Sequence, residues 1–434
     1  MTIRAVLFFI NLLAGGFFLW KYFFKNSLFL SLAVFLGAYG ALIFYALAAG
    51  MPLNFFIVNF PLALYPFALL GIKSRPGMTL WPRQPRRLYH LLAAAIFVIL
   101  ILGILHMMKA PLFERDGLGI WLTKAKMIVL DRSFLSEDFF NPWRIQDSPR
   151  YPLFLPLLEG SFMFQTAVNE LTVKLVFVYI WFLNLGMIYE NLVLRSGRAA
   201  FFSVIALAVV PAYYLMADGS LHTGYADIPI SLFYLSAGIF LLDYFPTGSK
   251  ITLAGAGLAV AFSAFTKNEG WAFGLSVLLV LIIARRKFSD LVLFLAFALI
   301  PNLPWLLTMI RLPNLYQEHY LRRIPEILPR LVHIPLILKN AVFEIFNIRH
   351  WGILWPLILA FFIFFKSSSV IRYLLSVILI TIACYLGTYL LTSWDISFQM
   401  SVSFARLLLH VTPLTVLLAA LHIIGIKNPP SSRP

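Results

Sequence analysis

Long apolar segments recur along the whole chain, and they constrain its fold more than any other feature. A helix needs about 20 consecutive, mostly apolar residues to cross the hydrocarbon core of a bilayer. The candidate spans are 5–20, 29–47, 54–72, 88–107, 173–194, 199–217, 227–245, 250–266, 270–284, 289–309, 351–366, 371–392 and 405–425. Because 61% of the residues are hydrophobic and only 12% are charged, the chain cannot cover these segments with polar groups in water. The sequence therefore predicts an all-α polytopic membrane protein with about thirteen transmembrane helices.

Lys and Arg in the short loops predict the orientation of these spans. The loop 73–87 is rich in both residues, so we expect it to be cytoplasmic. Alternation then places the basic loops at Lys250 and at 285–287 on the same side, whereas the loops 48–53 and 218–226 carry neither Lys nor Arg. This distribution accounts for the formal net charge of +16 without any nucleic-acid partner.

Two long polar loops, 108–152 and 310–350, fall on the opposite, extracytoplasmic side. Of the 18 acidic residues, only Glu190, Asp243 and Asp290 fall on the predicted cytoplasmic side. Long polar loops on a compact protein are usually functional, so we expect the chemistry on the outer face.

An apolar segment at 153–168 follows the first long loop. It carries Glu159 and is interrupted by Pro152 and Pro156. We interpret it as an interfacial or re-entrant helix, with a full span as the alternative.

The first outer loop carries a candidate acid–base group. The segment 117–130 is predicted to be a short amphipathic helix, on which Asp116 and Thr123, seven residues apart, share a face and Lys124 lies beside it. A carboxylate there could act as a general base, and a nearby cation could neutralise a phosphate leaving group. Alternatively, these charges are only solvated at the level of the lipid headgroups, and the residues alone leave both interpretations open.

Several motifs, in this order, resemble those of bacterial GT-C glycosyltransferases that use polyprenyl-phosphate sugars, such as protein mannosyltransferases and aminoarabinose transferases. The motifs are Asp116-Gly-Leu-Gly-Ile-Trp121-Leu-Thr-Lys124, Ser148-Pro-Arg150-Tyr151-Pro152, Ala226-Asp227-Ile228-Pro229, Thr266-Lys267-Asn268-Glu269-Gly270 and Ala405-Arg406. The resemblance implies a GT-C-like catalytic membrane domain over 88–434, with interfacial helices in the first outer loop. Three further transmembrane helices and a cytoplasmic loop, in 1–87, would precede it.

By this resemblance, Asp116 is the catalytic base of an inverting glycosyltransferase, although Glu114 is a second acidic candidate and a structural ion pair of Asp116 with Arg115 is the alternative. The donor would be a sugar on a polyprenyl phosphate, and the acceptor a glycan, lipid or protein. The predicted substrate-binding residues are Glu114, Trp121, Lys124, Arg150, Tyr151, His222, Asp227, Lys267, Glu269 and Arg406.

For several of these residues the sequence also allows a structural role. Asp227 could cap a helix, Lys267 could pair with Glu269, and Arg406 could pair with Asp395. A lone histidine such as His222 or His410 is more often a core or interface residue than a ligand.

No residue spacing suggests a zinc site or another cofactor, and any metal requirement stays open. The expected location is the bacterial cytoplasmic membrane, with the active site facing outside. The competing hypotheses are a polymerase or ligase of lipid-linked glycans and a secondary transporter.

Overall fold

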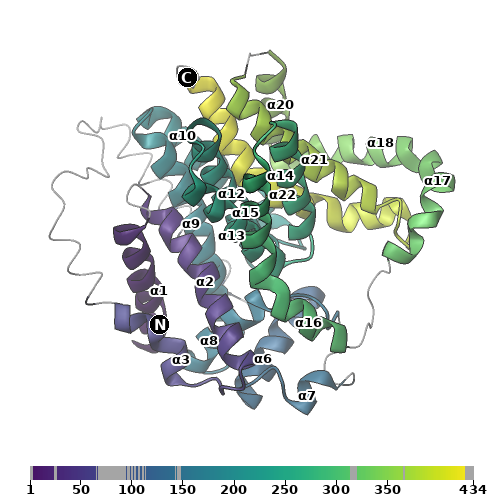
Figure 1. The fold of residues 1–434 in the computed structure, drawn as a ribbon. Coiled ribbons are helices and arrows are strands. Elements are labelled where there is room, and N and C mark those ends of the chain that lie inside the picture. The colour runs from purple at the N-terminus through teal and green to yellow at the C-terminus, as the bar shows by residue number, and fades with distance from the viewer. Residues whose placement is uncertain are drawn as a thin grey trace.

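The computed structural model describes residues 3–23, 27–64, 114–141, 148–312, 320–364 and 367–425, together with isolated positions between 66 and 112 and Trp143. Helices make up most of this described part, and it contains no strand (Figure 1). The basic loop 73–87 and most of the predicted span 88–107 lie outside the described residues.

Within the described residues, eight helical segments are long and apolar enough to cross a membrane, which makes the chain a polytopic integral membrane protein. They are α1 (Ile3–Tyr22), α2 (Leu28–Ala48), α9 (Lys174–Val193), Gly197–Leu215 with α10 (Gly197–Ala208) and α11 (Ala212–Leu215), α12 (Asp227–Thr247), Phe288–Arg311 with α15 (Phe288–Leu299), η3 (Ile300–Asn302) and α16 (Leu303–Arg311), α21 (Ser369–Thr388) and α22 (Ile396–Ile424).

Four more apolar helical segments are shorter. They are Phe55–Leu64 with α3 (Phe55–Asn59) and η1 (Phe60–Leu64), α13 (Lys250–Thr266), α14 (Gly270–Ile283) and α20 (Leu354–Phe364). The predicted count of about thirteen is thus met only in part: twelve of the expected spans have a helical counterpart, and eight of those reach full spanning length.

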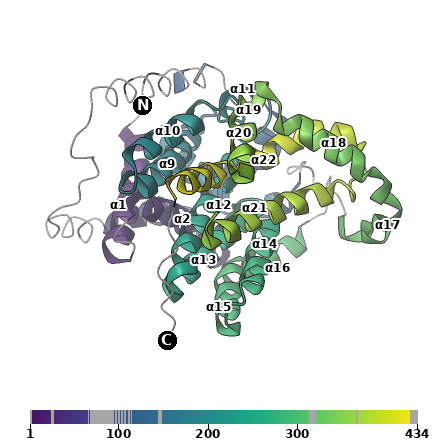
Figure 2. The same ribbon diagram turned by 90° about the horizontal axis from the view of Figure 1, so that it is seen from above.

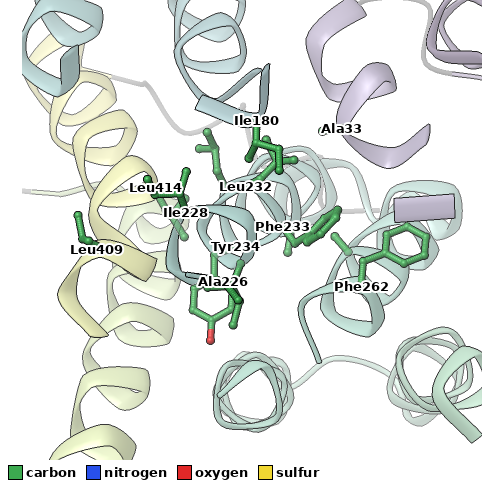
Figure 3. Close-up of a cluster of buried hydrophobic side chains, with 14 of the residues drawn as sticks. Ala33, Ile180, Ala226, Ile228, Leu232, Phe233, Tyr234, Phe262, Leu409 and Leu414 are labelled. Atoms are coloured by element: carbon green, nitrogen blue, oxygen red, sulfur yellow. The ribbon is translucent and has the colours of Figure 1, made fainter. Parts of the chain in front are cut away.

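Helices α12 and α22 form the centre of the bundle, because both are apolar around their whole circumference and are buried on nearly every face. Figure 3 shows side chains of α12, among them Leu232 and Phe233, packed between Ile180 of α9, Phe262 of α13 and Leu414 of α22. This packing fixes the first residue of α12, Asp227, relative to the middle of α22.

The polar residues at the loops predicted to be cytoplasmic have structural partners. The carboxylate of Glu190, near the end of α9, accepts hydrogen bonds from the backbone N–H groups of Leu28 and Phe29 and so satisfies the N-terminus of α2. In α15, Asp290 pairs with Lys250 and accepts a hydrogen bond from the hydroxyl of Tyr244 at 2.7 Å.

The first outer loop folds into η2 (Gly117–Leu122), α6 (Thr123–Asp131) and α7 (Glu137–Phe140). The predicted helix 117–130 is present, but its first six residues form a π-helix, with the Thr123 hydroxyl bonded to the carbonyl of Leu118 at 2.7 Å. A π-helix has more residues per turn than an α-helix. The seven-residue spacing of Asp116 and Thr123 therefore does not correspond to two α-helical turns.

Helix α8 (Phe154–Thr166) corresponds to the segment predicted to be interfacial or re-entrant. Its 13 residues are too few to cross a bilayer, and nearly all of them are buried, Glu159 included. It packs against α6 and α2, so the first outer loop is fixed to the helix bundle through α8.

The second outer loop forms a chain of short helices: η4 (Tyr320–Glu326), α17 (Ile327–Arg330), η5 (Leu331–His333), α18 (Ile334–Ile345) and α19 (Ile348–Trp351). Figure 1 and Figure 2 both show α17 and α18 extending away from the bundle. The guanidinium groups of Arg323 and Arg330 attach this chain of helices by donating to the carbonyls of Leu391 and Thr392, at 3.3 and 2.6 Å.

Candidate functional site

Asp227, the first residue of α12, is a fully buried carboxylate with three hydrogen-bond donors around it. Its Oδ1 lies 2.8 Å from Nζ of Lys267 and 2.7 Å from Nε2 of His410, and its Oδ2 lies 3.2 Å from Nε of Arg406. A buried charge is tolerated only when it is paired and hydrogen-bonded, and these donors meet that condition. The residue preceding it, Ala226, is at the N-cap position, so Asp227 is not a helix cap.

Arg406 of α22 joins this buried carboxylate to the first outer loop. Its Nη1 lies 3.3 Å from Oδ2 of Asp116, and its guanidinium stacks over the ring of Tyr225 at 4.4 Å. The side chain of Asp116 is 34% exposed, that of Arg406 15% and that of Asp227 0%. The three side chains therefore form a line from the surface to the interior, with Asp116 at its accessible end.

The turn between α13 and α14 supplies the second cation. Nζ of Lys267 bridges Asp227 and Glu269, which lies 3.0 Å away. Gly270 closes this turn so tightly that a Cβ atom there would lie 2.3 Å from the backbone nitrogen of Ala264. The glycine thus keeps both charged residues at the end of the helix bundle where α12 begins.

Two glycine contacts bring the first outer loop onto the loop 218–226. A Cβ atom on Gly117 would lie 2.0 Å from the carbonyl oxygen of Thr223, so the backbones touch directly where η2 begins. Gly219 has a φ of +83° and lies against both Arg406 and Asp227. Side chains at either position would push Asp116 or Arg406 out of the arrangement described above.

Acidic and phenolic groups surround the exposed end of this arrangement. The hydroxyl of Tyr225 donates to Asp218 at 2.8 Å, and burial together with the charge of Asp116 raises the pKa of Tyr225. Burial and the charge of Asp218 also raise the pKa of Glu114. The predicted site residue Glu114 is therefore close to the site without belonging to the ion-pair network.

A chain of side chains from three helices continues from Asp227 into the bundle. Nδ1 of His410 lies 3.2 Å from the hydroxyl of Tyr385, which lies 2.7 Å from the hydroxyl of Tyr234. The Tyr234 hydroxyl also lies 2.9 Å from the carbonyl oxygen of Glu269. The chain therefore starts at Asp227 and ends at Glu269, the two residues whose carboxylates contact Lys267.

The structure brings together five of the predicted site residues: Asp116, Asp227, Lys267, Glu269 and Arg406. It shows the Lys267–Glu269 pair that the sequence allowed, but not the pair of Arg406 with Asp395. Arg406 pairs with Asp116 and Asp227, whereas Asp395 accepts from the N–H of Phe398 and caps α22.

The other predicted residues of the first outer loop have structural partners. Lys124 is fully buried and donates from Nζ to the carbonyls of Ser148 and Tyr151, so its amino group faces the protein interior. Burial lowers the pKa of Lys124 to about 7. The ring of Tyr151 meets the buried indole of Trp121 edge to face at 5.4 Å.

Arg150 and His222 lie in loops, and each contacts a polar group. Nε of Arg150 donates to the carbonyl of Leu312 at 2.9 Å and so ties the first outer loop to the end of α16. Nδ1 of His222 lies 2.9 Å from the hydroxyl of Ser220.

Sequence reasoning did not assign a role to Tyr225, Tyr234 or Tyr385, and it favoured a core or interface position over a ligand role for His410. Aromatic residues are common throughout this chain, 18 of them tyrosines, so none of these positions stands out from its neighbours. Asp227 and Arg406 were detectable because a charge inside or beside a long apolar segment is costly and is usually functional.

No protein-family model matches the chain, and neither a curated protein nor a solved structure shows significant similarity to it. Among the described residues, no group of three or more His, Cys, Asp or Glu side chains is arranged to hold a metal ion. The chemistry that the site can perform therefore follows from its own residues. It offers an accessible carboxylate beside a guanidinium and an ammonium group, at one end of a helix bundle with apolar walls.

Proposed function

We propose that the chain is an inverting glycosyltransferase with a GT-C-like fold, which moves a sugar from a polyprenyl-phosphate donor to an acceptor on the extracytoplasmic face of a bacterial cytoplasmic membrane. The observation that carries the proposal is the position of Arg406 between the exposed carboxylate of Asp116 and the buried carboxylate of Asp227. A base and a phosphate-binding cation are thereby held side by side, as group transfer from a lipid phosphate requires.

In the proposed reaction, the carboxylate of Asp116 removes the proton from an acceptor hydroxyl or amine. The acceptor atom then bonds to the anomeric carbon from the face opposite the phosphate, and the bond between that carbon and the phosphate oxygen breaks. The bonding electrons leave with the phosphate, which departs as polyprenyl phosphate. This in-line displacement inverts the anomeric configuration.

Arg406 and Lys267 are the cations that would stabilise the negative charge on the departing phosphate. Asp227 pairs with both cations and is buried beneath them, so we assign it the role of a positioning residue for Arg406 and Lys267. The many exposed apolar side chains of the spanning helices suit the polyprenyl tail as well as the membrane lipids.

A secondary transporter is the less favoured alternative, because the ion-pair network involves the ends of α12, α13 and α14. Transporters bind their substrates near the bilayer midplane, at discontinuous helices of paired repeats. A polymerase or ligase of lipid-linked glycans would use the same kind of base and leaving group, so the substrate has to distinguish it.

The test uses the purified protein in proteoliposomes with a panel of radiolabelled polyprenyl-phosphate sugars and a bacterial envelope extract as the acceptor source. We expect label to move from the lipid to an acceptor for at least one of these sugars. Label transferred only from polyprenyl diphosphate oligosaccharides would favour a polymerase or ligase. Passage of free sugar across the proteoliposome membrane, without any transfer, would favour a transporter.

A further inference from the structure

Four contacts link Asp227 to the backbone of the α13–α14 turn. Each contact needs one proton to be a hydrogen bond, so the contacts can be counted against the protons of the side chains between the two ends. They are Asp227 to His410 at 2.7 Å, His410 to Tyr385 at 3.2 Å, Tyr385 to Tyr234 at 2.7 Å and Tyr234 to the Glu269 carbonyl at 2.9 Å. Each tyrosine hydroxyl has one proton, and a neutral imidazole has one. With His410 neutral, three protons serve four contacts, so one contact has no hydrogen bond.

The two ends of the chain limit which contact that is. Asp227, paired with Lys267 and Arg406, is a carboxylate that only accepts, so Nε2 of His410 carries the imidazole proton. At the other end, the Tyr234 hydroxyl donates to the carbonyl of Glu269. The Tyr385 hydroxyl then has one proton for two partners, Nδ1 of His410 and the Tyr234 oxygen, so one of these two contacts has no hydrogen bond.

A proton added at Nδ1 of His410 supplies the missing donor. Nδ1–H then donates to Tyr385, Tyr385 donates to Tyr234, and Tyr234 donates to the carbonyl of Glu269. All four contacts become hydrogen bonds, and the complete chain ties the backbone of the turn that carries Lys267 to α12, α21 and α22.

Several charged and titratable groups surround His410. From the elements around it these are Asp227 and Tyr234 of α12, Tyr385 of α21, and Lys267 and Glu269 of the α13–α14 turn, with Arg406 one helical turn earlier on α22. With His410 neutral, the three carboxylates of the network (Asp116, Asp227 and Glu269) exceed its two cations by one charge. An added proton at His410 balances them and makes the site more favourable for an anionic phosphate.

We propose that His410 is a positioning residue for the phosphate-binding cations: its protonation completes the hydrogen bonds of the tyrosine chain, holds the Lys267 turn in place and strengthens binding of the lipid phosphate. This inference rests on the proposed function, because the lipid phosphate is the ligand whose affinity responds. The affinity for polyprenyl phosphate should therefore rise as the pH falls through the titration of His410.

The substitution His410→Gln isolates this effect. A glutamine can donate from its amide nitrogen to Asp227 and accept at its oxygen from Tyr385, which copies the neutral state of the histidine and cannot take up a proton. Tyr385→Phe breaks the chain in the middle. The matched control is Tyr389→Phe in the residue that follows α21, which removes a hydroxyl bonded to Ser403 at 2.8 Å, outside the chain.

The experiment measures binding of a fluorescent polyprenyl phosphate to each full-length variant in lipid nanodiscs across pH 5 to 8. In the wild type and in Tyr389→Phe we expect the affinity for polyprenyl phosphate to rise about tenfold as the pH falls. This rise is measured relative to any change that His410→Gln shows. We expect His410→Gln to keep the high-pH affinity of the wild type throughout. Tyr385→Phe keeps the added charge but not the chain, so we expect it to show a smaller step than the wild type. The ionisation of the ligand itself is common to all variants and cancels in this comparison.

Nitrogen NMR of protein labelled at histidine gives a reading that does not depend on the ligand. The signal absent from His410→Gln should change from a neutral to a doubly protonated imidazole as the pH falls, and Tyr385→Phe should shift that change. A step that persists in His410→Gln, or an imidazole that stays neutral across the range, would overturn the inference and leave the glycosyltransferase proposal intact. Absence of any polyprenyl phosphate binding by the wild type would instead count against the proposed function.

Discussion

Nη1 of Arg406 lies 3.3 Å from Oδ2 of Asp116, although 290 positions separate the two residues in the chain. Asp116 begins the helix of the first outer loop, and Arg406 lies within the last long helix. Their meeting joins the loop that sequence motifs marked as catalytic to the buried ion-pair network of the bundle.

Gly117→Ala should separate Asp116 from Arg406. The new Cβ atom would lie 2.0 Å from the carbonyl of Thr223, so η2 has to move away from the loop 218–226. Displacement of a catalytic group by about 1 Å can lower activity by about 10²-fold, and we expect a loss of this order in sugar transfer. Gly197→Ala is the control, because nothing lies within 4 Å of a Cβ atom there. Equal transfer rates in the two variants would contradict this contact's role.

Asp227→Asn should destabilise the protein as well as inactivate it. The substitution leaves Lys267 and Arg406, whose side chains are only 4% and 15% exposed, without their shared carboxylate. Removing one partner of a buried ion pair costs about 3–5 kcal/mol, which thermal unfolding in detergent would detect. Asp395→Asn should have little effect, since asparagine caps a helix N-terminus as well as aspartate does. Similar melting temperatures for both variants would refute the assigned role of Asp227.

Arg406→Lys should weaken donor binding although it preserves the charge. A guanidinium can contact Asp116 and Asp227 at once through Nη1 and Nε, whereas an ammonium is a single point charge. Loss of one charged hydrogen bond corresponds to roughly a tenfold to hundredfold weaker affinity for polyprenyl phosphate in nanodiscs. Arg195→Lys, at an exposed arginine after α9, is the control and should bind normally. Unchanged affinity of Arg406→Lys would show that the fork geometry is not needed.

Lys124 should give the folded state a distinctive dependence on pH. Burial lowers its pKa to about 7, whereas the pKa of a lysine in an unfolded chain is about 10.4. Between these values the unfolded state binds more protons, so the contribution of Lys124 to stability increases as the pH rises from 7 to 10. Unfolding of the wild type and of Lys124→Met over this range should show a rise that only the wild type has. Parallel curves would mean that Lys124 titrates normally in the folded protein.

The sequence was sufficient to predict the class of fold and part of the site. Apolar segments of spanning length must be helices in a bilayer, because every backbone polar group needs a partner within the segment. Charges at the ends of such segments, such as Asp227 and Lys267, stand out for the same reason. Twelve of the predicted spans accordingly have helical counterparts in the structure.

Sequence periodicity did not predict the features that depend on tertiary contact. The π-helical start of the first outer loop lies where Gly117 packs against the backbone of Thr223, a contact between segments more than one hundred positions apart. Lys124 carries a charge in a polar loop, a pattern typical of an exposed residue, yet it is buried against two backbone carbonyls. The tyrosine–histidine chain joins α12, α21 and α22, and no local pattern indicates which aromatic residues meet there.

The most direct test of the account is the rate of sugar transfer by Asp116→Asn, measured together with its affinity for polyprenyl phosphate. The side chain is 34% exposed, so the variant should fold, and Arg406 remains available for the phosphate. We expect a 10²- to 10⁴-fold lower rate with donor affinity no weaker than that of the wild type, whereas Glu137→Gln in the same loop should transfer normally. Full transfer activity in Asp116→Asn would contradict the assignment of Asp116 as the catalytic base.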